Sequence, residues 1–292
     1  MESNQTEIPN GVEAVEHQLP MTINYKKDKF YVRECYPKYY DFITSALNRK
    51  DYISLTGTPG IGKSIFYIYF FQRYRRENPN QTVVTAAFTG NRTLKKCAVF
   101  QPNNQEGVEM KGIPRIEGAI YFYDGPPDIK PEDKMVCFTS RKYEWLNEMI
   151  KEEYHLALYL PFWTLNELLE ANDLLELGLR EDVIKQRFFL FGGSARYCLS
   201  NDDLFVELEA IDLREQARSI NSLREVRKVL EMNALCKSFV LHAVFHLVPT
   251  VSDRTPTVPE SPADWWIHYP LFFKFEFCSK EIGRLVYDSI TE

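Results

Sequence analysis

Residues 57–64 read Gly57-Thr-Pro-Gly-Ile-Gly-Lys-Ser64, which satisfies the pattern G-x-x-x-x-G-K-[ST] at every fixed position. The run before them, Tyr52–Thr56, is short and apolar, as a buried strand is. The residues after them are largely apolar and contain no helix breaker until Pro79, which predicts a helix from Lys63 to about Arg76. A glycine-rich turn between a strand and a helix is the context of a phosphate-binding loop. The sequence therefore predicts an α/β fold with a P-loop at this turn.

Each residue type in this P-loop has an expected chemical role. The glycines permit backbone angles that turn N–H groups toward phosphate, and the start of the helix adds a partial positive charge. Lys63 is expected to reach the β- and γ-phosphates, and Ser64 to place its hydroxyl on Mg²⁺. We expect ATP with Mg²⁺ as the ligand, bound by Gly57, Thr58, Pro59, Gly60, Ile61, Gly62, Lys63, Ser64 and Ile65.

A second metal-binding residue is expected at Asp124. It ends the apolar strand-like run Ala119–Tyr123, where the acidic residue of a Walker B strand belongs. The alternative is an aspartate that only initiates the turn before Gly125. Many P-loop ATPases of the class with an additional strand place a catalytic glutamate directly after this aspartate, whereas this chain has Gly125. Asp128 and Glu144 are weak candidates to replace that base.

The next strand-like run, Met135–Thr139, leads to Ser140. In the additional-strand class, this strand lies between the P-loop strand and the Walker B strand. Its polar end then faces the γ-phosphate, so Thr139 or Ser140 is a candidate for orienting the attacking water. Polarity at an ordinary strand end is an equally good interpretation.

An arginine from a later helical region is also expected at the phosphates. The segment FFLFGGSARY, residues 188–197, resembles the second sensor of AAA+-type ATPases, in which a helical lid presents an arginine. Arg196 occupies that place, and Arg187 on the preceding helix is a second candidate. The alternative is a surface arginine that follows a Gly-Gly turn.

The order of strand and helix signals predicts a mostly parallel sheet with helices on both faces. Residues 90–117 are expected to form a loop or hairpin excursion, and Pro37 to mark a turn between a strand and a helix. The expected organisation is a flexible tail at 1–24, a P-loop NTPase core at 25–163, a helical lid at 164–248, and a linker with a C-terminal strand-helix segment, α/β or winged-helix-like, at 249–292.

Composition narrows the class of protein. With 45% hydrophobic and 26% charged residues among 292, the chain can bury a core and is not broadly disordered. A net charge of −6 provides no general field for holding nucleic acid. The basic cluster Arg73–Arg76 is more often a solvated helix end than a binding face.

The location of the protein is also constrained. The six cysteines are scattered without a C-x-x-C pair, which argues against zinc and favours a reduced, intracellular setting. The polar, acidic N-terminus does not have the pattern of a secretion signal, and no apolar run is long enough to span a membrane.

Five segments together resemble a known family. LTGTPGIGKSIF, IYFYDGPP, VCFTS, LPFWTLNEL and FFLFGGSARY occur in the order and spacing of the P-loop ATPase module of Crinkler-type effectors and retrotransposon hot spot proteins. The most discriminating parts are Trp163-Thr-x-x-Glu167-Leu168 and the Gly-Gly-x-x-Arg segment. The resemblance covers roughly residues 25–290 and implies an AAA+/STAND-like ATPase core and lid.

In that family, the module often precedes a nuclease-like domain, and some members act on DNA in host nuclei. The resemblance therefore implies DNA or a nuclease-type domain as a partner, and the nucleus or a host nucleus as a location; a homo-oligomer is also considered. Unlike secreted members of that family, the chain lacks an N-terminal translocation region, and it shows no paired-acid-plus-lysine nuclease motif, so the resemblance does not extend to secretion or to DNA cleavage by this chain.

Three functions remain to be compared. The first is an ATPase that hydrolyses ATP slowly and couples hydrolysis to movement of its lid. The second is a nucleotide-gated module that binds DNA or a protein with little or no hydrolysis. The third, a P-loop kinase, is disfavoured because the sequence shows no arginine-rich lid helix for closing over a second substrate.

Overall fold

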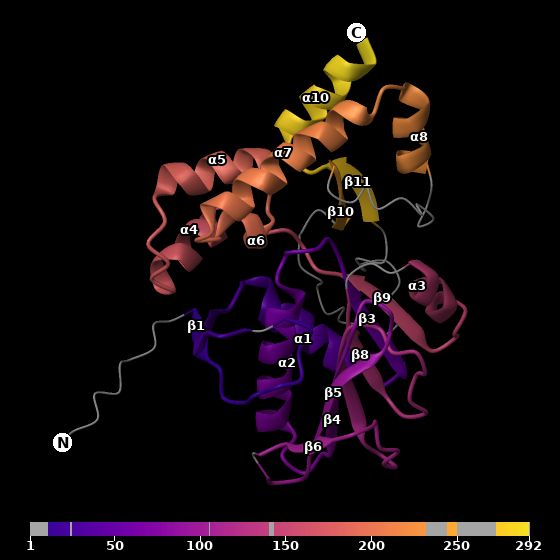
Figure 1. The fold of residues 1–292 in the computed structure, drawn as a ribbon. Coiled ribbons are helices and arrows are strands. Elements are labelled where there is room, and N and C mark those ends of the chain that lie inside the picture. Colours follow the sequence, from indigo (N-terminus) through magenta and orange to yellow (C-terminus); the bar gives the residue numbers. More distant parts are fainter. Residues whose placement is uncertain are drawn as a thin grey trace, which may run out of the picture.

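A seven-stranded sheet forms the centre of the core, the lower part of the molecule in Figure 1. The computed structural model describes residues 11–23, 25–104, 106–139, 143–231, 244–249 and 273–291. The strand order is β6-β5-β4-β7-β8-β3-β9. Five neighbouring strands are parallel: β4 (Val83–Phe88), β7 (Ile120–Asp124), β8 (Met135–Phe138), β3 (Tyr52–Thr56) and β9 (His155–Tyr159).

The position of β8 identifies the subclass of the fold. It lies between the P-loop strand β3 and the Walker B strand β7, as the additional-strand class requires. The expected α/β P-loop NTPase fold is therefore confirmed. The expected hairpin excursion is also present: β5 (Leu94–Phe100) and β6 (Val108–Met110) extend the sheet in antiparallel register.

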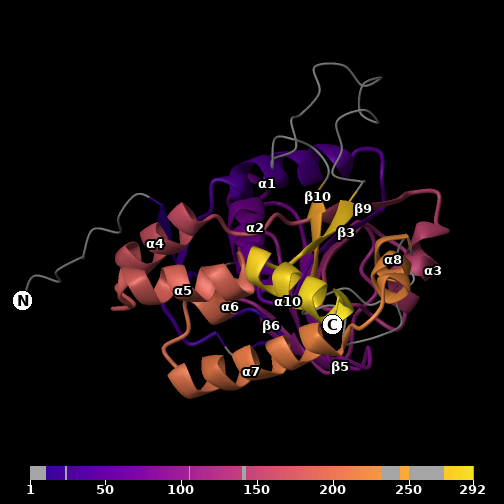
Figure 2. The same cartoon turned by 90° about the horizontal axis from the view of Figure 1, so that it is seen from above.

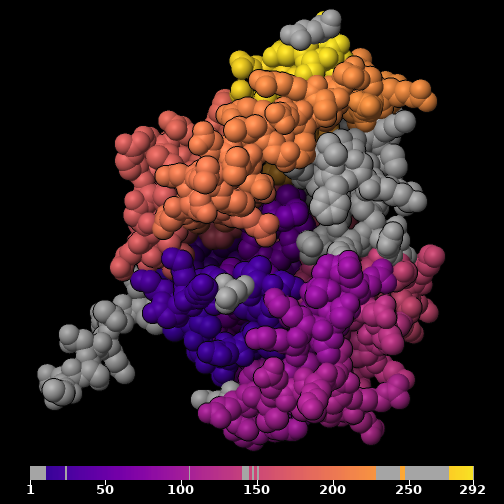
Figure 3. Space-filling model, viewed as in Figure 1, coloured from indigo at the N-terminus to yellow at the C-terminus, as the bar shows by residue number. Residues whose placement is uncertain are grey.

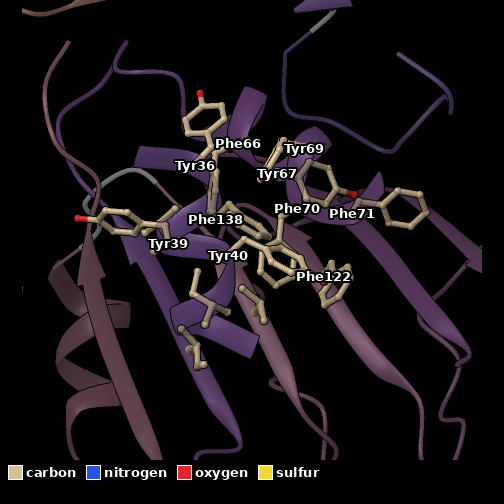
Figure 4. Close-up of a cluster of buried hydrophobic side chains, with 14 of the residues drawn as sticks. Tyr36, Tyr39, Tyr40, Phe66, Tyr67, Tyr69, Phe70, Phe71, Phe122 and Phe138 are labelled. Carbon is tan, nitrogen blue, oxygen red and sulfur yellow. The ribbon is translucent and has the colours of Figure 1, made fainter. Parts of the chain in front are cut away.

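Helices cover both faces of the sheet. On one face, α1 (Cys35–Ala46) and α2 (Lys63–Glu77) bury a dense group of aromatic rings against β7 and β8 (Figure 4). On the other face, α3 (Tyr143–Ile150) packs against alternate residues of the same strands. Pro37 lies in the first turn of α1 and not in a separate turn, because the first helical turn does not need its N–H group.

Part of the expected tail is packed on the core, which corrects the assignment of 1–24 as flexible. β1 (Val12–Ala14) pairs antiparallel with β2 (Lys29–Tyr31). The Gln72 side chain on α2 accepts from the N–H of Glu16 at 2.9 Å and donates to the carbonyl of Ala14 at 3.0 Å. Val12 is buried. A buried apolar residue and satisfied main-chain groups thus keep this segment on the core.

The helices from Leu165 onward, including α10, form a second layer over the core and are called the lid below (Figures 1 and 2). It has buried clusters of its own, in which α7 packs against α10 and α4 against α5. Its described helices are α4 (Leu165–Leu174), α5 (Glu181–Phe191), α6 (Ala195–Cys198), α7 (Asp203–Ser219), α8 (Leu223–Glu231) and α10 (Lys280–Thr291).

One lid segment differs from its expected structure. Phe245–Pro249 is a strand, β10, where a helix was expected to continue to residue 248. It pairs antiparallel with β11 (Phe273–Phe277), a partner distant in the sequence. β11 is followed by α10, which is the strand-helix order expected near the C-terminus. The domain boundaries themselves stay predictions. Among the described residues, no helix is long and apolar enough to cross a membrane.

Candidate nucleotide-binding site

The P-loop has the backbone geometry that its glycines predict. β3 ends at Thr56, and α2 begins at Lys63. Gly60 and Gly62 between them have φ of 84° and 93°, in the left-handed region that favours glycine. A Cβ atom on Gly60 would lie 2.7 Å from the Ser194 hydroxyl. The loop is therefore tightly turned and in direct contact with the lid.

The side chain of Lys63 folds back onto the P-loop. Its ammonium group donates to the carbonyl oxygens of Gly57 at 3.0 Å and Thr58 at 2.8 Å. The pKa of Lys63 is lowered to about 7, mainly by burial and then by the nearby Arg196, while Asp124 opposes the shift. An ammonium group with this little solvation and one nearby counter-charge is suited to an incoming anion.

The two expected magnesium ligands come together from separate elements. The hydroxyl of Ser64, at the start of α2, donates to Oδ1 of Asp124 at 3.1 Å. Asp124 ends β7 and is buried. Burial raises the pKa of its carboxyl, while hydrogen bonds from Thr22 and Ser64 and the charge of Lys63 oppose this. A hydroxyl and a carboxylate are the hard oxygen ligands that Mg²⁺ prefers, so the pair fits a magnesium ion.

Thr22 is a site residue that the sequence did not reveal. Its N–H and its hydroxyl donate to Oδ2 of Asp124 at 2.6 and 2.7 Å. The two residues are 102 positions apart, and Thr22 belongs to a segment expected to be a tail. No motif surrounds it, so the contact could be found only in the tertiary structure.

The candidates for orienting water are only partly described. Thr139 is buried beside the P-loop strand, and its N–H donates to the carbonyl of Leu55 at 2.9 Å. Ser140 lies outside the described residues, as does the side chain of Glu144. The role given to Thr139 or Ser140 stays a prediction.

Arg196 and Arg187, the two lid arginines, have different surroundings. The main-chain N–H of Arg196 donates to the carbonyl of Gly60 at 3.1 Å, and its exposed side chain lines the cavity above the P-loop. The buried Arg187 instead donates to the Ser200 carbonyl at 2.6 Å and to Asp203 at 2.5 Å. These contacts tie α5 to the start of α7, so Arg187 has a packing role in the lid.

The Trp163–Leu168 segment joins the core, the P-loop and the lid. The indole N–H of Trp163 donates to the carbonyl of Ile61 at 2.9 Å. Thr164 and Glu167 form a capping box at the start of α4. Glu167 also accepts from the buried Arg33 at 3.0 Å, and the Arg33 guanidinium lies 4.8 Å from the centre of the Trp163 ring.

A cavity of about 870 Å³ lies between core and lid, above the P-loop (Figure 3). Its polar side includes Lys63, Ser64, Asp124 and Arg196. Aromatic and aliphatic side chains line other parts of its wall, among them Tyr25, Phe30, Tyr31, Leu175, Leu177 and Leu199. Among the described residues that line it, Asp124 is the only acidic one.

Gly125 explains why a second acid does not follow Asp124. Its φ is 101°, and a Cβ atom there would lie 3.0 Å from the carbonyl oxygen of Phe88. A glutamate at this position would therefore be strained in its backbone. Asp128, one of the candidate replacements, has an exposed side chain.

Comparison with known proteins gives a coarse likeness only. No protein-family model matches the chain, and no curated protein matches it. Among solved structures, the Thermotoga maritima RuvB Holliday junction branch migration motor is 14% identical, with 81% of this chain and 95% of that chain covered and a TM-score of 0.35. A mutant of the same protein has the same identity and coverage, with a TM-score of 0.38. The assignment of the site rests on its own geometry.

Proposed function

We propose that this protein binds ATP with Mg²⁺ and hydrolyses it slowly, and that the bound nucleotide controls the position of the lid. The observation that carries this proposal is the 3.1 Å contact between the Ser64 hydroxyl and the Asp124 carboxylate, beside Lys63 on an intact P-loop. These groups come from the start of α2 and the end of β7, which the fold brings to one edge of the sheet.

The chain's own residues would divide the work as follows. Main-chain N–H groups of the P-loop and the Lys63 ammonium bind the phosphates. Ser64 and Asp124 hold Mg²⁺, which when bound neutralises charge on the phosphate oxygens. The apolar wall that includes Tyr25 and Leu177 excludes water around the nucleotide base.

The lid contacts support nucleotide control of its position. Trp163 at the entry to the lid and Arg196 within it both hydrogen-bond to P-loop carbonyls, at 2.9 and 3.1 Å. A nucleotide that changes the conformation of the P-loop would therefore change two of its hydrogen bonds to the lid. The Arg196 side chain, exposed at the cavity, can approach the γ-phosphate when the lid closes.

A second candidate is a nucleotide-gated binding module with little or no hydrolysis. Gly125 favours it, because no carboxylate base follows Asp124 and the described cavity wall carries no other acid. Turnover of a purified sample with and without DNA separates the two candidates. The resemblance to Crinkler-type and retrotransposon hot spot modules supports the finer proposal of an intracellular, nuclear protein that works with DNA or a nuclease-type partner, or as a homo-oligomer.

Thermal unfolding with Mg-ATP tests the central proposal. At a hundredfold excess of ligand over Kd, binding stabilises the folded state by about 2.7 kcal/mol. Lys63→Ala is expected to lose most of this shift, and Asp124→Asn to need more Mg²⁺ for the same shift. Lys38→Ala, an exposed lysine on α1, serves as the matched control and should behave as the parent protein. A full Mg-ATP shift in Lys63→Ala would show that the P-loop is not the binding site.

A further inference from the structure

The Asp124 carboxylate is held on both of its oxygens. Oδ1 accepts from the Ser64 hydroxyl at 3.1 Å. Oδ2 accepts from the main-chain N–H of Thr22 at 2.6 Å and from the Thr22 hydroxyl at 2.7 Å. One oxygen therefore faces the other expected magnesium ligand, while the opposite oxygen is anchored by the N-terminal loop, residues 15–23, that follows β1.

Thr22 is itself fixed from several directions. The ammonium group of Lys95 on β5 donates to the Thr22 carbonyl at 3.1 Å. Further back along the N-terminal loop, the N–H of Val15 donates to the carbonyl of Asp28 at 2.7 Å, and Gln72 on α2 accepts from Glu16. The position of the Thr22 donors is thus set by Lys95 on β5, by Gln72 on α2 and by the hydrogen bond between Val15 and Asp28.

We propose that Thr22 is a positioning residue for the metal-binding carboxylate, its two donors holding Asp124 so that Oδ1 stays directed toward Ser64. The inference rests on the proposed function. A buried carboxylate with no donors on its second oxygen carries a large desolvation cost and is free to rotate away from Ser64. The Thr22 N–H and hydroxyl remove that cost without occupying the oxygen that the metal needs.

An alternative role for Thr22, competition with Mg²⁺ for Asp124, predicts the opposite change in Mg²⁺ affinity. If the hydroxyl competed with Mg²⁺ for Asp124, its removal would make the metal bind more tightly. If it positions Asp124, its removal makes the metal bind more weakly, and serine at this position restores binding. The Mg²⁺ dependence of nucleotide binding therefore distinguishes positioning from competition and from a purely structural contact.

The experiment titrates Mg²⁺ at constant ATP and follows the thermal midpoint of the full chain. Thr22→Val keeps the main-chain N–H and the shape of the side chain but loses the hydroxyl. Its half-maximal Mg²⁺ concentration should rise about tenfold, as expected for one lost hydrogen bond to a charged group. Thr22→Ser should stay close to the parent. ATP binding in the presence of EDTA should be equal in all of them.

Thr44→Val is the matched control, since among the described residues its hydroxyl bonds to carbonyls of its own helix α1; its Mg²⁺ dependence should not change. Thr22→Ala replaces Thr22→Val if that variant does not fold. Unchanged or tighter Mg²⁺ dependence in the valine variant, or failure of serine to restore it, would overturn the positioning role alone. A parent protein that Mg-ATP does not stabilise would overturn the proposed function and this inference together.

Discussion

The indole N–H of Trp163 donates a hydrogen bond to the main-chain carbonyl of Ile61 at 2.9 Å. This bond joins Trp163, two residues before the start of the lid helix α4, to the middle of the P-loop. Arg33 lies over the same indole ring and pairs with Glu167 of α4, so the tryptophan is held on two sides. The P-loop is therefore supported by a residue that also marks the entry to the lid.

Replacing Trp163 by phenylalanine should weaken nucleotide binding. The Ile61 carbonyl would lose its partner, and a net hydrogen bond of about 1 kcal/mol corresponds to roughly fivefold in affinity. Isothermal calorimetry with Mg-ATP measures this. Trp145→Phe is the control, because Trp145 is also buried but packs between α3 and the sheet, in a different cluster from Trp163. If Trp163→Phe and Trp145→Phe bind Mg-ATP with equal affinity, the Ile61 contact does not support the P-loop.

Removing the Arg196 side chain should weaken the binding of ATP more than the binding of ADP. A guanidinium that reaches the γ-phosphate makes a charge-assisted contact of about 1.5–3 kcal/mol that ADP cannot receive. Arg196→Ala should therefore lose about tenfold or more in affinity for ATP and little for ADP. Arg180→Ala, an exposed arginine at the start of α5, should change neither. An equal loss for both nucleotides would return Arg196 to the role of a surface residue.

Hydrolysis by the isolated chain should be slow. A positioned base contributes on the order of 10²–10⁴-fold, and enzymes typically turn over at roughly 10 s⁻¹, which leaves roughly 10⁻¹ to 10⁻³ s⁻¹ without one. Single-turnover measurements on purified protein test this. Asp128→Ala should have no effect, since Asp128 is exposed. A rate near 10 s⁻¹ that survives Asp128→Ala and Glu144→Ala would place the base elsewhere.

The His155 side chain should make stability depend on pH. Its Nε2 lies 2.8 Å from the hydroxyl of the buried Ser54, and burial lowers the pKa of His155 to about 4, with smaller contributions from Lys50 and Lys130. Between the usual pKa of about 6.5 and this value, the unfolded chain binds a proton that the folded chain does not. Stability should therefore fall as the pH drops through this window, by on the order of 2 kcal/mol.

Urea unfolding at several pH values measures that loss. His155→Gln keeps a hydrogen-bonding side chain beside Ser54 but cannot titrate, so its stability should fall less over the same window. The difference between the stability-against-pH curves of the parent and His155→Gln gives the contribution of His155, because the carboxyl groups of the chain contribute equally to both. Parallel curves for the parent and the variant would show that His155 does not titrate differently on folding.

Local patterns were sufficient for the core of this fold. Gly57–Ser64 between an apolar strand and a helix predicts the P-loop, because glycine spacing and hydrophobic runs act over a few residues. The strand-end position of Asp124 and the placement of β8 between β3 and β7 also followed from the strand signals and the class of fold. Packing then confirmed the fold that these short segments had predicted.

The contacts that complete the site depend on tertiary structure. Thr22 meets Asp124 across 102 positions, and Arg33 meets Glu167 across 134. Neither pair lies in a periodic pattern, so sequence spacing carries no sign of it. Phe245–Pro249 likewise becomes a strand only because Phe273–Phe277 pairs with it. The sequence by itself determined the strand, glycine-rich turn and helix at which we propose phosphate and metal binding, whereas the folded chain decided which distant donors hold those groups in place, because a hydrogen bond depends on proximity in space and not along the chain.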